Sequence, residues 1–132
     1  MMTETTPNVV VTFADGLPGF ERCRQFVLVE SEDLQPFRLV QGLGEDGPSF
    51  VGIDPRHVEH SYDVQLDRND LTRLDAQPGQ PLVWLAIITA RADRPATANL
   101  RAPIVINPRA MRGIQLLTPE SSYRVDHPFP AQ

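Results

Sequence analysis

The sequence contains no lysine, a single cysteine and no long apolar run. One cysteine, Cys23, is too few for an internal disulfide or for a zinc site built on several thiolates. No window approaches the roughly 18 consecutive apolar residues of a membrane helix, and the start of the chain lacks a basic head followed by an apolar stretch. These absences exclude a disulfide framework and a zinc finger. They predict a protein of the reducing cytoplasm with neither a membrane segment nor an export signal.

The length of 132 residues predicts one compact domain over residues 1–132, with only the ends, 1–6 and 128–132, expected to fray. Hydrophobic residues make up 41% of the chain and charged residues 22%. Because both values lie near the averages of globular proteins, wholesale disorder is excluded.

Charge is unevenly distributed along the chain. Seventeen acids face twelve bases, all arginine, for a net charge of −5, and an acidic protein is a poor binder of nucleic-acid phosphates. Residues Glu30–Asp75 carry a net −7, whereas Arg91–Arg124 carry a net +4. Ordinary solvated surface is the simpler interpretation, because halves of a sequence need not be halves of the molecule. A charged face directed at a protein partner is the alternative.

Thirteen prolines are spread between short apolar runs, a pattern typical of many short strands separated by turns. This spacing predicts an all-β fold: a small antiparallel, partly closed β-barrel of about eight to ten strands with one or two short helical turns. The predicted strands are Asn8–Phe13, Phe26–Glu30, Phe37–Leu43, Ser49–Ile53, Ser61–Leu66, Leu82–Thr89, Ile104–Asn107, Ile114–Thr118 and Tyr123–Asp126.

Two segments have helical signals. Asn69 or Asp70 is a suitable cap for a short helix that a Pro78-Gly79 turn would end, and Arg109–Gly113 has room for one further turn. The strand Leu82–Thr89 is apolar on both faces, which predicts a central position in the sheet and a core position for Trp84.

Catalytic and cofactor motifs are weak. The glycines of Gly42–Gly47 have the spacing of a dinucleotide-binding loop, yet Pro48 and a strand follow where that loop requires a helix. Residues 42–47 are therefore interpreted as a hairpin turn. Cys23 between two arginines is interpreted as a half-buried, inert thiol, because no histidine is near it in sequence.

Asp54, His57 and His60 are the only candidates for metal ligands. A spacing of three places the two histidines on opposite faces of a strand, so they are interpreted as exposed turn residues. The sequence thus predicts no catalytic residue, no cofactor site and no metal site.

Two proline-containing blocks stand out instead. Leu17-Pro18-Gly19-Phe20 has the composition of a type II turn, which would fold Phe13 and Phe20 back onto one core. The expected role of this motif is structural, and its residues are Phe13, Leu17, Pro18, Gly19 and Phe20. In Asn99–Asn107, Pro103 restricts the apolar run to an edge strand or a bulge, and an open edge would offer a site for partners.

In this combination the chain resembles the FliW family of flagellar assembly factors from about Phe13 to His127. The resemblance rests on the blocks Phe13–Glu21, Pro36–Gly42, Ser49–Pro55, Asn99–Asn107 and Gly113–Gln115, together with Tyr123. It implies a small cytoplasmic all-β protein without catalytic activity or cofactor, monomeric when free. The chain departs from the family at Gly42, where serine commonly follows the glutamine, and in its glycine-rich, acidic loop Leu43–Pro48.

The resemblance also implies two protein partners. One is CsrA, a small dimeric RNA-binding regulator of translation, and the other is newly made flagellin, bound near its C-terminal region as by a chaperone. Export of flagellin would release the factor to antagonise repression by CsrA, at a site distinct from the RNA surface. The candidate partner-binding residues are Asn99, Pro103, Ile104, Asn107, Gln115 and Tyr123. A stand-alone ligand-binding barrel and an enzyme with an unrecognised carboxylate or histidine site remain the alternatives.

Overall fold

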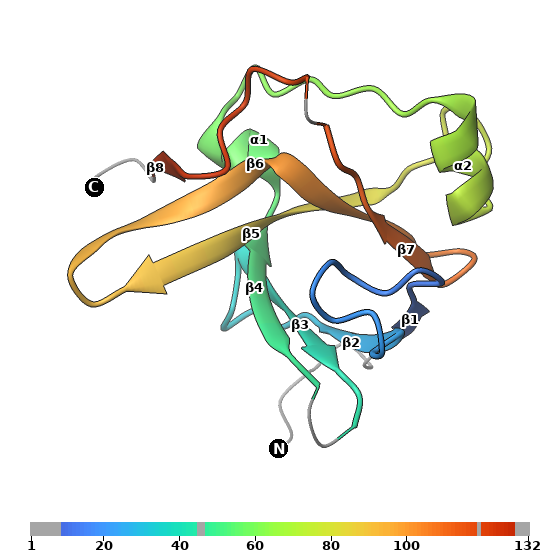
Figure 1. Ribbon diagram of the computed structural model, residues 1–132, viewed down its shortest axis with the longest axis horizontal. Coiled ribbons are helices and arrows are strands. Elements are labelled where there is room, and N and C mark those ends of the chain that lie inside the picture. The colour runs from blue at the N-terminus through green and yellow to red at the C-terminus, as the bar shows by residue number, and fades with distance from the viewer. Residues whose placement is uncertain (1–8, 45–46, 119, 129–132) are drawn as a thin grey trace.

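The structure, a computed structural model, describes residues 9–44, 47–118 and 120–128. Within these residues one sheet has the strand order β5-β4-β3-β2-β1-β7-β6-β8 (Figure 1). The strands are β1 Val9–Thr12, β2 Gln25–Val29, β3 Phe37–Gly42, β4 Ser49–Ile53, β5 Val83–Arg91, β6 Arg94–Asn107, β7 Arg112–Gln115 and β8 His127–Pro128. The helices described are α1 Pro55–Val58 and α2 Arg68–Leu74.

The sheet closes into a barrel because β5 pairs with β6 as well as with β4. Every neighbouring pair in the ring is antiparallel except β1 with β7, which is parallel and meets at Thr12 and Arg112. The Thr12 amide also donates to the Met111 carbonyl at 2.9 Å. The predicted small β-barrel is therefore confirmed, and one short parallel pair completes its closure.

An apolar cluster fills the barrel interior. Its buried members are Val11, Phe13, Leu17, Phe26, Leu28, Val40, Leu85, Ile104 and Ile106. The Phe13 and Phe26 rings pack edge to face, with centroids 5.2 Å apart, a favourable arrangement of aromatic quadrupoles. Gly113 lies against this pair, because a Cβ there would come within 2.5 Å of the Phe13 ring. Glycine at this point of β7 is therefore required by the packing of the core.

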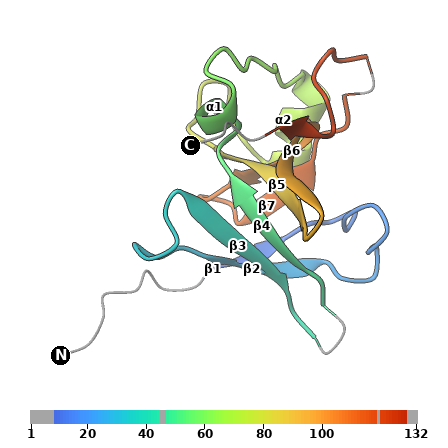
Figure 2. The same cartoon turned by 90° about the vertical axis from the view of Figure 1, so that its left-hand side faces the viewer.

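A second apolar cluster lies on the other face of β4, β5 and β6, under α1 and the chain that follows it. Its buried members are Ile53, Val58, Tyr62, Ala86, Ala98 and Leu100. Figure 2 shows both helices on the side of the barrel away from β1 and β2. This part of the sheet is consequently apolar on both faces, as predicted for the central strand β5.

The predicted type II turn is confirmed. Gly19 has φ +87°, and the Phe20 amide donates to the Leu17 carbonyl at 2.7 Å. Leu17 and Phe13 are buried as expected, but Phe20 is 42% exposed and packs edge to face on Phe50. The expectation that Phe20 would join the core is therefore wrong, because its ring lies at the surface against the half-buried Phe50.

The helix predicted from Asn69 or Asp70 exists but begins earlier. Asp67 is its cap and accepts from the Asp70 amide at 2.8 Å, while Asp70 accepts from the Asp67 amide at 3.0 Å. This reciprocal pair is a capping box in which aspartate replaces the usual glutamate. The helix ends at Asp75, in the left-handed region with φ 54°, before the Pro78-Gly79 turn.

The sequence did not predict α1, which begins after Asp54. The Asp54 side chain accepts from the Arg56 amide at 2.9 Å, and Pro55 occupies the first helical position. Aspartate before proline is a known helix start, but four residues are too few to produce an apolar period. Residues 109–113, by contrast, form a turn and the start of β7 rather than a helix.

Two predicted strands are wrong. Residues 61–66 run as an extended chain from α1 to α2 without joining the sheet (Figure 1), and residues 123–126 precede the short strand β8. The predicted strand Ile104–Asn107 is only the end of a much longer β6. Of the ends expected to fray, Pro128 lies in β8, where it pairs with Thr97, and the rest are outside the described residues.

The hairpin interpretation of residues 42–47 is confirmed. β3 and β4 are paired antiparallel, and the Gly42 amide donates to the Pro48 carbonyl at 2.7 Å. The tip of this turn, residues 45–46, lies outside the described part of the chain.

Candidate functional site

A wide bulge interrupts β6 at the proline block. Between Leu85 and Ile87 of β5 the pairing moves from Ile104 to Asn99, so residues 100–103 of β6 are accommodated opposite a single residue. The Asn99 side-chain oxygen stabilises the bulge by accepting from the Arg101 and Ala102 amides at 3.1 and 3.0 Å. Pro103 is buried within it.

Of the two predicted positions for Pro103, the bulge is confirmed and the open edge is wrong. Ile104 pairs with Leu85 of β5 on one side and with Gln115 of β7 on the other. The second neighbour is β7, Arg112–Gln115, so the predicted strand Ile114–Thr118 is correct only for its first two residues. No free edge remains here for a partner to extend.

The bulge anchors the C-terminal part of the described chain. The Arg101 guanidinium donates to the carbonyls of Tyr123 and Ser121 at 2.8 and 3.1 Å. The Leu100 amide donates to the Arg124 carbonyl at 2.9 Å. These bonds hold residues 121–124 against β6, although residues 121–124 are not part of a strand.

Tyr123 joins this segment to the chain between the helices. Its ring packs on Tyr62 with centroids 4.6 Å apart, and its hydroxyl accepts from the Asp63 amide at 2.9 Å. The Tyr62 hydroxyl donates to the Leu100 carbonyl at 2.8 Å, and burial raises the pKa of this phenol above its ordinary value. The tyrosine pair therefore fixes the start of the extended segment against the bulge.

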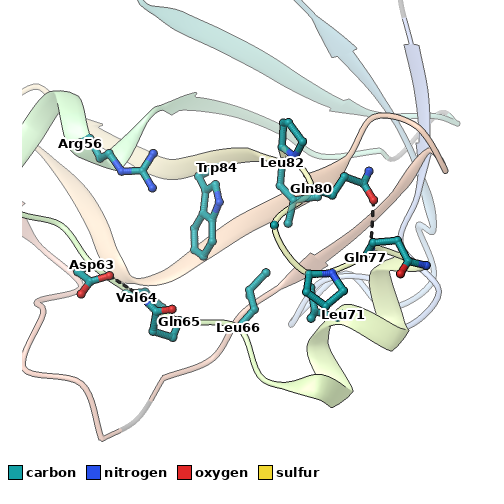
Figure 3. A pocket seen from close by; sticks show the side chains of 13 residues that line it. Arg56, Asp63, Val64, Gln65, Leu66, Leu71, Gln77, Gln80, Leu82 and Trp84 are labelled. Carbon is teal, nitrogen blue, oxygen red and sulfur yellow. Dashed lines mark hydrogen bonds between the residues drawn. The ribbon is translucent and has the colours of Figure 1, made fainter.

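That extended segment, residues 63–66, separates two open grooves. The tryptophan groove, of about 540 Å³, has Trp84 at its floor between Leu66 and Leu82, with Arg56 and Asp63 at one end (Figure 3). Trp84 is half-buried: it packs against two of the apolar core clusters, as predicted, while the rest of its ring forms part of the groove surface.

The second groove, of about 630 Å³, lies between residues 63–67 and the chain that follows β7. We call it the acidic groove because each charged side chain among its described lining residues is a carboxylate: Asp63, Asp67, Asp70 and Glu120. Leu117 supplies an apolar element and is 61% exposed. Tyr123 also lines this groove.

Of the six predicted partner-binding residues, Tyr123 alone lines one of the two grooves, and the other five lie in or next to the strands that support them. Tyr123 lines the acidic groove, and Gln115 supports the same wall by donating to the Ala102 carbonyl at 3.0 Å. Asn107 is completely buried and accepts from the Gln80 side chain at 2.6 Å, which holds one wall of the tryptophan groove. The other three predicted residues belong to the bulge in β6: Asn99, Pro103 and Ile104.

The remaining predicted features lie apart from the grooves or at their margins. His57 is exposed on α1 and His60 follows it, and no three His, Cys, Asp or Glu residues of the described chain are grouped so that they could hold a metal ion. Cys23 is half-buried, as predicted, and its thiol lies 3.6 Å from the Gln25 carbonyl. No helix in the described ranges is long and apolar enough to cross a membrane.

Fold and site together define a small closed β-barrel protein whose surface carries two open grooves, one on each side of the extended segment 63–66. The family model described as FliW protein matches residues 2–129. The chain belongs to the FliW family of flagellar assembly factors.

Individual relatives agree with this assignment. The flagellar assembly factor FliW of Clostridium botulinum (strain Alaska E43 / Type E3) is 33% identical over 118 residues, which cover 89% of this chain and 84% of that protein. The protein of the same name from Syntrophotalea carbinolica is 34% identical over 128 residues, covering 97% and 91%. A crystal structure of the flagellar assembly factor FliW superposes with a TM-score of 0.82 at 35% identity, covering 93% of this chain and 87% of the other.

Proposed function

We propose that the chain is a non-enzymatic, cytoplasmic switch that binds two proteins in turn. One partner is flagellin, held through its C-terminal region, and the other is the translational regulator CsrA. Binding of the chain to CsrA would relieve repression of flagellin translation, and free flagellin would occupy the chain and restore that repression. The observation that carries the proposal is membership of the FliW family along nearly the whole chain.

The surface described above supports a protein-binding role. Open grooves of about 540 and 630 Å³ flank an extended chain, and apolar side chains such as Trp84 and Leu117 reach the surface beside them. Protein interfaces favour aromatic and aliphatic side chains surrounded by polar ones. We therefore place partner contacts on this face, with Tyr123 as the predicted residue best positioned to touch a partner.

Relief of repression does not require the chain to cover the RNA site of CsrA. A partner bound elsewhere lowers the affinity of CsrA for RNA when the two ligands favour different states of CsrA, or when the bound protein hinders RNA approach. The proposal therefore predicts that RNA affinity falls while some RNA still binds at saturating amounts of this chain.

The experiment combines this protein with flagellin and CsrA from the same genome. Size-exclusion chromatography should detect a complex with each partner separately, and flagellin should displace CsrA. A labelled leader RNA of the flagellin transcript, bound to CsrA, should dissociate in part when the chain is added, and some RNA should stay bound at saturation. Absence of both complexes at micromolar concentrations would contradict the proposal and favour a stand-alone ligand-binding barrel. Catalytic turnover of a small molecule in the tryptophan groove would favour the enzyme alternative.

A further inference from the structure

The segment Asp63–Leu66 has the side-chain pattern of a β-strand but pairs with no strand in the described part of the chain. Tyr62, Val64 and Leu66 are buried or half-buried, whereas Asp63 and Gln65 are exposed. The Asp63 amide donates to the Tyr123 hydroxyl, but the backbone groups of Val64, Gln65 and Leu66 have no hydrogen-bond partner among the described residues. An ordered, extended segment with unpaired backbone groups is a template for another chain.

The segment is also held in place and accessible. The tyrosine pair fixes Asp63 at the start of the segment, and the capping box of α2 fixes Asp67, which follows its last residue. A groove runs along each side, and both grooves are lined by Asp63, Val64 and Gln65. An incoming peptide would therefore meet a strand that is already ordered, which lowers the entropy cost of binding.

We propose that residues 63–66 form a docking strand, completed in the acidic groove by an extended segment of a partner protein with basic and apolar residues in alternation. The inference rests on the proposed function only in that the chain binds proteins. Backbone pairing would supply the attachment, as in other cases of strand addition. Side chains of the added strand would reach Leu117 on one face and the carboxylates on the other.

Charge determines which occupant the groove favours. Asp63 and Asp67 point to the same face of the segment, four positions apart, and Asp70 and Glu120 line the same groove. Oppositely charged residues across a strand pair are stabilising, and like charges are destabilising. A basic partner strand therefore fits, whereas an acidic one is repelled.

The same charges disfavour a second copy of this chain. Antiparallel self-pairing centred on Gln65 would place Asp63 opposite Asp67 twice, and parallel self-pairing would align each acid with itself. The docking strand is thus protected from self-association while it stays open to a basic partner.

The test uses the full chain labelled with ¹⁵N and capped seven-residue peptides of alternating valine and arginine. Hydrogen exchange of the Val64, Gln65 and Leu66 amides is followed with and without peptide, and the dissociation constant is measured by titration. We expect the arginine peptide to bind and to slow exchange within this segment. A peptide with glutamate in place of arginine should bind at least tenfold more weakly, because every acid of the groove would repel it.

Two methylated arginine peptides separate strand addition from general attraction. One carries N-methyl groups on the amides of one strand edge and the other on the opposite edge. Strand pairing requires that only one of them binds, whereas attraction by charge alone would leave both equally effective. Asp63→Asn should weaken binding of the arginine peptide about 1.4- to fivefold, since an exposed ion pair contributes about 0.2–1 kcal/mol. The exposed Asp93→Asn is the matched control.

Equal binding of the two methylated peptides, or exchange protection confined to another part of the chain, would overturn the docking strand. Exchange protection of these amides that grows with protein concentration in the absence of peptide would show that a second copy of the chain is the occupant. That result would also overturn the docking strand. Complexes with flagellin and CsrA are scored separately by chromatography. Their presence without protection at residues 64–66 would overturn this inference and leave the proposed function intact.

Discussion

Asn107 shows how a residue of a recognisable motif serves the fold. It is fully buried in β6, and its amide nitrogen donates to the carbonyls of Leu74 and Asp75 at 2.9 and 3.0 Å. Its oxygen accepts from the Gln80 side chain and from the Arg109 amide. One side chain thus links β6, the end of α2, the loop that carries Gln80 and the turn before β7. Asn107 is among the candidate partner-binding residues, but because it is fully buried it can affect a partner only through the fold that it holds together.

We predict that Asn107→Leu lowers the free energy of unfolding by about 3 kcal/mol or more, because several buried backbone groups lose their partner at once. Gln115→Ala, which removes one half-buried hydrogen bond to Ala102, should cost about 1 kcal/mol. Urea unfolding monitored by Trp84 fluorescence measures both. An Asn107→Leu variant as stable as the wild type would contradict the linking role.

Gly19 provides a second prediction at this scale. Gly19→Val should lower stability by about 1–2 kcal/mol, because the residue has φ +87° and L side chains with a branched Cβ resist that region. A Cβ at this position would meet no atom within 4 Å, so the cost is conformational strain and not a clash. Thermal unfolding measures the effect, and Gly19→Asn, which tolerates positive φ better, is the control. Equal melting of the valine variant and the wild type would contradict the turn assignment.

Among the elements, α2 carries an unusual acid in its capping box. Burial, together with the neighbouring Asp67 carboxylate, raises the pKa of Asp70 above its ordinary value of 3.8, although the bond from the Asp67 amide opposes the shift. The folded state therefore binds a proton at Asp70 more tightly than the unfolded state does. Protonation of this side chain favours the fold.

We predict that the stability of the wild type relative to Asp70→Asn rises as the pH falls from neutral towards 3.8, and becomes constant below that value. Asparagine keeps the oxygen that accepts from the Asp67 amide but does not titrate. Urea midpoints of both proteins between about pH 7 and pH 3.5 measure the difference. The comparison is needed because Glu21, Glu59 and Asp126 have lowered pKa values and act in the opposite direction in both proteins. A constant difference would contradict the raised pKa.

The elements also show how far the sequence predicts this structure. β2 and β4 were located to within a residue because alternation and flanking turns reflect a sheet with one apolar face inside the barrel. The same alternation in residues 61–66 correctly predicts a chain that buries every second side chain. It does not predict whether a neighbouring strand pairs with that chain, because pairing depends on which segments lie beside it in three dimensions.

Similar reasons explain what was missed at the site. Tyr123 was found through the family resemblance, but the strand predicted around it does not form, because Arg101 rather than a neighbouring strand satisfies its carbonyl. Trp84 was placed in the core because β5 is apolar on both faces, yet the loop between α2 and β5 leaves a groove above it. Loop paths of this kind depend on distant packing, such as the bond between Gln80 and Asn107.

At the scale of the whole molecule, the uneven charge predicts different behaviour towards the two proposed partners. CsrA binds RNA and must present basic surface, so the acidic stretch Glu30–Asp75 should attract it over long range. Terminal segments of flagellin are amphipathic and would be held mainly by apolar burial. An open edge at Pro103 is not available to them, because Pro103 is buried in the bulge and the next residue, Ile104, is paired with both β5 and β7.

We predict that raising salt slows the association of this chain with CsrA much more than it speeds dissociation, whereas association with flagellin changes little. The physical reason is that exposed charges are screened over about 8 Å at physiological ionic strength. Stopped-flow or surface-based kinetics at low and high salt measure both pairs. Equal salt sensitivity would mean that the acidic stretch is ordinary solvated surface.

The parallel pair that closes the barrel also affects how the chain folds. Strands β1 to β4 each pair with the next strand along the chain, so they can assemble while synthesis is still under way. Thr12, however, meets its partner only when Arg112 is present, 100 positions later, and contacts so distant in sequence form slowly. Until then the nascent chain exposes β1 as a free edge, open to aggregation. Pairing of β7 with β1 is therefore the step that covers this edge, so the protection of the barrel against edge-to-edge association depends on the few residues of β7.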